Sequence, residues 1–272
     1  MGMTTSAVET NRDNTNTSNG KITNQTLEIL KNFSSINSNI LVKEGNVLKT
    51  ISPVKNVMAE ATVSETFEQE FGIWDLNKFL GTVSLFDDPE FNFDEKFVTI
   101  SSQKNNSSVK YYYSEPLLLT TVNKEIKMPE PVVSCTITEK TFSDIRKAAS
   151  VLQISDIAIR SNNDTLELVA LDKKDSTSNS YSINLGDLPS DDNDFAFYFK
   201  AENLKMLPGD YDVHITEKVV SQFTNINRSL NYWVALESDS YYNGWHMNTL
   251  VTGGNGLVGS AINSEFKPIR RN

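Results

Sequence analysis

The fold is decided by residues 138–171, which read TEKTFSDIRKAASVLQISDIAIRSNNDTLELVAL. In the first half of this stretch, apolar side chains recur three or four residues apart, at Phe142, Ile145, Ala149 and Leu152. This spacing places side chains on one face of an α-helix. Two apolar runs follow, and the turn residues Asn162-Asn163-Asp164 separate them, which predicts a β-hairpin. The stretch therefore predicts one helix packed against antiparallel strands.

The first half of the chain shows the same order of elements. Its first helix is predicted from an apolar face at Ile29, Leu30, Phe33 and Ile36. A hairpin is predicted next from the runs 40–42 and 47–51, followed by strands at 58–63 and 67–73. A second helix is predicted from an apolar face at Leu76, Phe79, Leu80 and Val83. Strands near 97–101 and 109–113 close this half.

The second half completes the repeat with strands and a short helix over 201–207, which stops at Pro208-Gly209. The repeated order predicts an α+β fold of two similar domains, each with two helices packed on an antiparallel sheet. We expect a disordered tail over 1–24, domains over 25–114 and 133–240, a proline-containing extended linker over 115–132, and an unstructured extension over 241–272.

The composition excludes several classes of protein. The chain has 272 residues, 38% of them hydrophobic, and no apolar run long enough to predict a membrane-spanning helix. The polar N-terminal residues do not resemble a secretory signal. A single cysteine, Cys135, excludes an internal disulfide and a cysteine zinc cluster, and two histidines leave little for a metal site. We therefore expect an intracellular protein with no metal, no cofactor and no catalytic constellation.

The net charge of −10 hides a local asymmetry. Acidic residues concentrate in the connections at 87–95 and 187–194, whereas the predicted helices carry lysine away from their apolar faces. These lysines are Lys31, Lys78, Lys140, Lys147, Lys200 and Lys205. Lysine contacts phosphate as a flexible point charge and does not read bases. The set is consistent with a sequence-independent DNA surface, and also with the solvated helix faces common in globular proteins.

Four segments resemble the DNA polymerase sliding clamp of T-even-like tailed phages. They are 30–38 (LKNFSSINS), 74–81 (WDLNKFLG), 152–159 (LQISDIAI) and 232–240 (YWVALESDS). The resemblance runs in order from Leu27 to Ser240 and implies the DNA-clamp fold. Clamps of this family are closed rings of six similar domains, so a two-domain chain would assemble as a homotrimer.

The resemblance also implies a function. The ring would encircle duplex DNA, tether the replicative DNA polymerase as a processivity factor, and have no enzymatic activity. An ATP-driven clamp loader would place it on DNA, and it would also act as a late-transcription coactivator. Its location would be the cytoplasm of an infected bacterial host.

The resemblance assigns roles to particular residues. The six lysines named above would face DNA in the pore. The partner peptide of the polymerase would bind under the linker, in an apolar pocket formed by Leu117, Leu118, Leu119, Tyr232, Val234 and Leu236. These side chains could equally complete the core. Neighbouring subunits would join by pairing the strand at 109–113 with the strand at 166–171.

Residues 247–262 stand apart from this assignment. Gly253, Gly256 and Gly259 form a TGxxGxxG pattern that resembles the start of an extended short-chain dehydrogenase. The chain ends ten residues later, so the rest of a nucleotide-binding domain is missing. Two alternative functions follow: a nucleotide-sugar oxidoreductase fragment, or a phage structural protein with surface lysines.

Overall fold

The computed structural model describes residues 19–104, 106–122, 126–188, 194–217, 220–243 and 245–246. The described part contains the α-helices α1 (Asn24–Ser34), α2 (Leu76–Val83) and α3 (Glu139–Val151), and the 3-10 turns η1 (Pro116–Leu118) and η2 (Ala201–Asn203). The strands of the first half are β1 (Asn19–Gly20), β2 (Ile40–Val42), β3 (Gly45–Ile51), β4 (Val57–Phe67), β5 (Phe71–Ile73), β6 (Glu90–Phe93), β7 (Phe97–Ser102) and β8 (Ser107–Tyr112). Those of the second half are β9 (Val133–Ile137), β10 (Asp156–Asn162), β11 (Thr165–Leu171), β12 (Tyr181–Asp187), β13 (Phe195–Lys200), β14 (Tyr211–Ile215), β15 (Val220–Asn225), β16 (Leu230–Ala235), β17 (Tyr241–Tyr242) and β18 (Trp245–His246).

Each α-helix begins at a side-chain cap and buries one face. The side chains of Thr23, Asp75 and Thr138 accept hydrogen bonds from the first-turn amides of α1, α2 and α3. Such caps satisfy backbone donors that have no partner within the helix. The buried faces contain Ile29, Leu30, Phe33, Leu76, Phe79, Val83, Phe142, Ile145 and Ala149. The three helices predicted from these spacings are confirmed.

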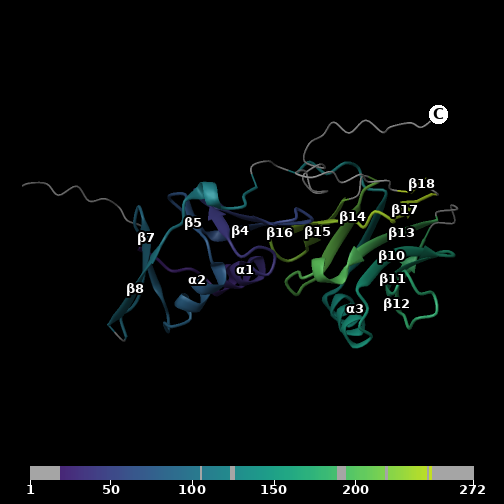
Figure 1. Cartoon of the computed structure of the whole chain (residues 1–272), viewed down its shortest axis with the longest axis horizontal. Helices are drawn as coiled ribbons and strands as arrows, with labels where there is room; N and C mark the ends of the chain where they lie inside the picture. Colours follow the sequence, from purple (N-terminus) through teal and green to yellow (C-terminus); the bar gives the residue numbers. More distant parts are fainter. Residues whose placement is uncertain are drawn as a thin grey trace, which may run out of the picture.

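One sheet runs through both halves of the chain. We call it the interdomain sheet; its strand order is β3-β4-β16-β15-β14-β9. Strand β4 of the first half pairs with β16 of the second, from Leu230↔Ala61 to Val234↔Val57. Figure 1 shows all three helices along the lower side of the molecule, with the interdomain sheet above them. The two halves therefore present their helices on the same side.

Side-chain hydrogen bonds join α1 to the second half. The Tyr232 hydroxyl, on β16, donates to Asn32 Oδ1 on α1 at 2.6 Å and accepts from the Leu207 amide at 3.3 Å. The Asn32 amide nitrogen in turn donates to the carbonyl of Lys205 at 2.9 Å. Tyr232 is fully buried, so its hydroxyl must have partners for the burial to be favourable.

Each half also has a sheet of its own. The first-domain sheet has the order β1-β6-β7-β8, and the second-domain sheet has the order β12-β11-β10-β13-β17-β18. Both are antiparallel, and α3 packs on β11 and β12. The predicted α+β arrangement in two halves is confirmed.

The predicted hairpin between 40–42 and 47–51 is wrong. Strand β2 pairs with β5, as in Leu41↔Gly72, whereas β3 pairs with β4 through the turn at 52–56. The runs predicted at 58–63 and 67–73 are the long strand β4 and the short strand β5. Alternation of apolar residues identifies strands, but it does not determine which neighbour each strand pairs with.

The fourth predicted helix, over 201–207, is a single 3-10 turn at Ala201–Asn203. Leu204 and Met206 are both buried, which is the alternation of extended chain rather than of a helix. A helix of this length, ending at Pro208, gains too few hydrogen bonds to offset the cost of its first turn. The second half therefore has one α-helix among its described residues.

The folded part of the chain extends further at both ends than the sequence predicts. Residues 19–20, which we expected in the disordered tail, form β1 against β6, and Thr23 caps α1. Residues 241–246, which we expected in the unstructured extension, contribute β17 and β18 to the second-domain sheet. The glycine pattern at 253–259 lies outside the described residues.

Two glycines give a matched test of the packing around the linker. A Cβ atom at Gly72 would lie 2.6 Å from Leu119 Cδ1 and 2.6 Å from the Ser114 carbonyl oxygen, whereas one at Gly81, inside α2, would meet nothing within 4 Å. We expect Gly72→Ala to lower the free energy of unfolding by about 1–3 kcal/mol through overpacking. We expect Gly81→Ala to raise it by about 0.5–1 kcal/mol through helix propensity. Urea unfolding measures both, and equal shifts would contradict this account.

Candidate nucleic-acid interface

The surface of the helices that faces away from the sheets carries exposed cations. We call it the helix surface, and define it by Lys31, Lys78, Arg146, Lys147 and Lys205. Among the described residues, none of the ion pairs that the structure contains uses these five side chains. Lys205 is included because it is exposed and its backbone lies beside α1, where its carbonyl accepts the hydrogen bond from Asn32.

Acidic side chains on the same surface are partly neutralised. Glu28 on α1 pairs with Arg228 at 3.2 Å. Asp144 on α3 pairs with Lys140, so this exposed lysine already has a counterion. Glu139 and Glu202 are exposed without an ion pair among the described residues. The helix surface thus carries more unpaired positive than negative charge, although the whole chain is acidic.

Lys200, which we expected in the pore, lies on the opposite face of the second-domain sheet. Side chains alternate along β13, so Phe197 and Phe199 pack into the main core with α3 while Tyr198 and Lys200 point the other way. The Lys200 ammonium donates to Asp156 at 2.7 Å and lies 3.9 Å from Glu237. The pore assignment of Lys200 is wrong because the segment is strand rather than helix at this position.

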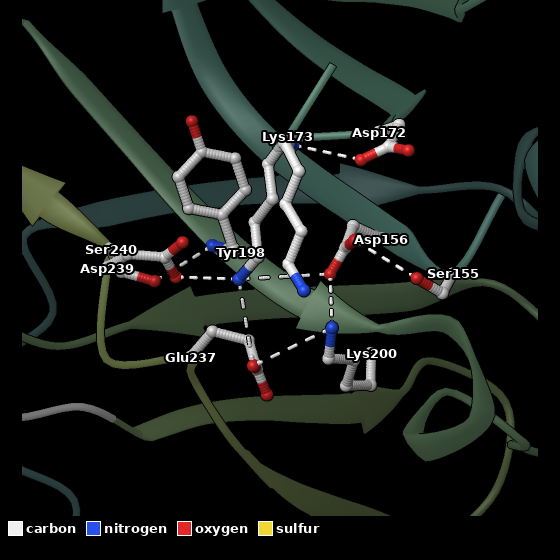
Figure 2. A network of polar contacts seen from close by, with 10 residues as sticks. Ser155, Asp156, Asp172, Lys173, Tyr198, Lys200, Glu237, Asp239 and Ser240 are labelled. Carbon is white, nitrogen blue, oxygen red and sulfur yellow. Dashed lines mark hydrogen bonds and ion pairs between the residues drawn. The ribbon is translucent and has the colours of Figure 1, made fainter. Parts of the chain in front are cut away.

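Lys200 belongs to a network of charges around Asp156 (Figure 2). Lys173 contacts three carboxylates, those of Asp239 at 2.8 Å, Glu237 at 3.7 Å and Asp156 at 3.8 Å. Its ammonium also lies 5.4 Å from the centre of the Tyr198 ring. The hydrogen bond that Lys200 donates to the Asp156 carboxylate raises the pKa of Lys200 above the usual lysine value. Both lysines are therefore held as structural cations.

The partner-pocket prediction fails for three residues of the last strands. Tyr232, Val234 and Leu236 are fully buried in the main core, on the side of the helices. The intervening residues Trp233 and Ala235 face the other side of the interdomain sheet. The side chains that face the linker are thus one position away from those predicted, because neighbouring residues of a strand point to opposite faces.

An apolar cluster on the linker side takes the place of these residues. We call it the linker cluster; it contains Ile51, Met58, Val220, Trp233 and Ala235, with Val122, Ile126 and Met128 of the linker packed against it. The indole N–H of Trp233 is buried and has no hydrogen-bond partner among the described residues. Sequence reasoning missed this cluster because β16 is apolar and buried on both faces over Tyr232–Ala235.

The three linker leucines differ in exposure. Leu119 is buried against Gly72, whereas Leu117 is 98% exposed and Leu118 is 63% exposed. The exposed pair lies in the turn η1, which is the N-terminal part of the linker. An exposed apolar pair in one turn is a candidate contact for an apolar partner.

Two long strands each have one backbone edge that pairs with no other strand among the described residues. Strands β8 and β12 are the terminal strands of the first-domain and second-domain sheets. The strand at 166–171, which we expected at a subunit contact, is β11, and it lies between β10 and β12. That prediction is wrong because both edges of β11 are already paired. The corresponding open edge belongs to β12.

The described residues offer no group of His, Cys, Asp and Glu side chains that could hold a metal ion. Cys135 is mostly buried, and burial raises the pKa of its thiol to about 12, so it is a poor nucleophile. No described helix is both long enough and apolar enough to cross a membrane.

Comparison with known proteins identifies the family. The family model described as DNA polymerase processivity factor matches residues 21–126, and the one described as gp45 sliding clamp, C terminal, matches residues 135–238. The sliding clamp of Enterobacteria phage T4 is 32% identical over 227 residues, which are 81% of this chain and 98% of the relative. The sliding clamp of Vibrio phage KVP40 is 28% identical over 223 residues, which are 80% of this chain and 99% of the relative.

Solved clamp structures share the fold at low sequence identity. The PCNA of A. fulgidus, bound to the C-terminal region of FEN-1, superposes with a TM-score of 0.59 at 13% identity, over 79% of this chain and 96% of that chain. A Helicobacter pylori beta clamp bound to a DNA ligase peptide gives a TM-score of 0.58 at 13% identity, over 78% of this chain and 63% of that chain. The chain therefore belongs to the sliding clamp family of DNA polymerase processivity factors.

Proposed function

We propose that three copies of this chain close into a ring around duplex DNA, with the helix surface toward the DNA. The observation that carries the proposal is the set of unpaired cations on the helix surface of a chain whose net charge is −10. An acidic protein with one cationic face can approach phosphates through that face alone. The family relationship supports the same orientation.

The strength of this attraction suits a ring that slides. Each phosphate contact releases counterions and adds affinity, so many tight contacts would slow movement along DNA. The helix surface offers separate lysines and one arginine rather than a dense cluster, and Glu139 and Glu202 dilute its charge. A closed ring stays on DNA through topology, so weak and sequence-independent contacts are sufficient.

Ring closure would pair β8 of one copy with β12 of the next. Val109 and Tyr111 on β8, and Ile183 and Leu185 on β12, are only partly buried where they pack against the core. Joining the two edges would cover these side chains and satisfy both open backbone edges. Repeating one contact in this way generates a closed ring when the rotation per copy fits.

The polymerase would be tethered at the linker. The exposed Leu117 and Leu118 offer an apolar anchor at the start of the linker, whose later residues Val122, Ile126 and Met128 pack on the linker cluster. The A. fulgidus and H. pylori clamps described above were solved with partner segments bound, which supports a peptide as the form of the partner.

The remaining parts of the proposal rest on the phage relatives. We place the protein in the cytoplasm of infected bacteria, acting without enzymatic activity of its own. An ATP-driven loader would open the ring, and the ring on DNA would also activate late transcription.

The mass in solution tests ring formation directly. We expect light scattering to give a species near three times 30.5 kDa that dissociates on dilution, since the proposed ring is joined only through two strand edges of each copy. The proposed ring would be overturned if the protein is a monomer at every concentration and its thermal unfolding temperature does not change with concentration.

Charge reversal tests the helix surface. We expect Lys31→Glu with Lys147→Glu to weaken binding to short duplex DNA, because fewer phosphates are then neutralised by the protein. The slope of log K against log salt should become shallower by about 0.9 for each phosphate that the variant no longer neutralises. Fluorescence anisotropy over a salt series measures this slope.

Two controls separate a DNA contact from a general change of charge. Lys127→Glu with Lys174→Glu makes the same change in net charge at exposed sites outside the helix surface, and should leave the slope unchanged. Lys200→Met should lower the free energy of unfolding by about 1–2 kcal/mol while leaving the slope unchanged, because Asp156 retains Lys173. An equal slope change in all three variants would contradict the assignment.

A linker substitution tests the tether. We expect Leu117→Asp to reduce stimulation of the cognate polymerase on primed circular DNA by about tenfold, as for removal of an apolar anchor, with little effect on thermal stability because the side chain is 98% exposed. Val54→Asp, at a side chain 71% exposed in the turn between β3 and β4, is the matched control. Stimulation that Leu117→Asp leaves intact would place the polymerase elsewhere.

A further inference from the structure

The chain that follows the last strand of the interdomain sheet covers the backbone edge of β13. One edge of β13 pairs with β10, from Asp156↔Lys200 to Arg160↔Ala196. The other edge faces residues 237–243, which we call the strap. The strap passes from the interdomain sheet onto the second-domain sheet and continues into β18, which pairs with β17.

Successive outward-facing groups of β13 and of the residue before it are satisfied by the strap. The Tyr198 carbonyl accepts from the Glu237 amide at 2.8 Å, and the Tyr198 amide donates to Ser240 Oγ at 2.9 Å. Ala196 pairs with Tyr241 in β17. The Asp194 carbonyl accepts from the Asn243 amide at 2.7 Å. The strap therefore follows the whole edge from Asp194 to Tyr198.

Charge and packing hold the strap in this place. Glu237 and Asp239 are the strap's two acids in the network of Figure 2, where the ammonium of Lys173 contacts both. Ser240 is completely buried. The Tyr242 ring packs on Phe195 and Phe197, with ring centres 6.0 Å and 6.3 Å apart. A segment that only trailed from the domain would not need these contacts.

The second part of the strap lies beyond the family match. The sliding clamp model matches this chain up to residue 238, whereas the hydrogen bond of Ser240, the pairing of Tyr241 and the packing of Tyr242 all come later. These contacts therefore come from residues that the sliding clamp model does not match.

We infer that the strap seals β13 so that β12 is the only long open edge of the second-domain sheet within the described residues. This inference rests on the proposed ring, which needs edge-to-edge pairing through β12 and no other edge of this sheet. An exposed strand edge pairs indiscriminately with other strands, and proteins protect such edges by covering them or by ending the sheet in a very short strand. Both devices are present here, because the strap covers β13 and the chain after it ends the sheet at β18, which has two residues.

Two truncations and one substitution test the strap. The chain ending at Ser240 lacks β17 and β18, whereas the chain ending at His246 keeps them and is the matched control for removal of the C-terminal residues. Tyr242→Ala in the full chain loosens the strap without truncation, and Tyr242→Phe, which keeps the ring that packs on Phe195 and Phe197, is its control. Hydrogen exchange over 195–199 and light scattering across a dilution series are measured on each.

We expect the chain ending at Ser240 and Tyr242→Ala to exchange the amides of 195–199 about tenfold faster or more, and to form a mixture of larger species at concentrations where the full chain gives one. The chain ending at His246 and Tyr242→Phe should behave as the full chain does. Equal exchange and equal mass distributions in both truncations would overturn the inference. If the full chain is not a trimer, the proposed ring is wrong but the inference on the strap is still tested. The exchange rates of the amides of 195–199 and any new self-association then show whether the strap protects β13.

Discussion

The pairing of β4 with β16 is the contact on which the arrangement of the molecule depends. These two strands come from opposite halves of the chain, and their ladder joins the halves into one six-stranded sheet. Because this sheet has two faces, each remaining layer of the molecule packs on one face or the other. The helices of both halves pack on one face, and the linker crosses the other with Val122, Ile126 and Met128. The partly buried hydrogen bond from Tyr232 to Asn32 anchors α1 to the second half on the helix side.

The distribution of charge follows from the same division. Lysines on the helices stand away from the sheets because the opposite sides of those helices are occupied by core residues. Lys200 and Lys173 lie on the other face of the second-domain sheet, where carboxylates hold them. A lysine's sequence context does not distinguish these two fates, but the element that carries it does. The net charge of −10 therefore says little about which ligand the protein approaches.

Sequence reasoning succeeded where one period dominated a long segment. The three helices were predicted from their apolar spacing, and the repeated order of elements indicated two similar halves. It failed where the outcome depended on tertiary partners. The short segment 201–207 follows the core rather than its helical propensity, and β2 pairs with β5 rather than with its neighbour along the chain. At the candidate partner site the prediction selected Tyr232 and Val234, whereas Trp233 and Ala235 face the linker. Nothing in the periodicity of β16 alone says which of its faces meets the helices.

The continuous interdomain sheet also limits how the protein can move. A hinge between the two halves would have to break the β4–β16 ladder and the hydrogen bond from Tyr232 to Asn32 together. Each chain is thus one rigid unit rather than two domains joined by a flexible linker. In the proposed ring of three chains, the bending that admits DNA would be concentrated at the contacts between β8 and β12, and a force that opens one contact would be transmitted through the rigid chains to the other two.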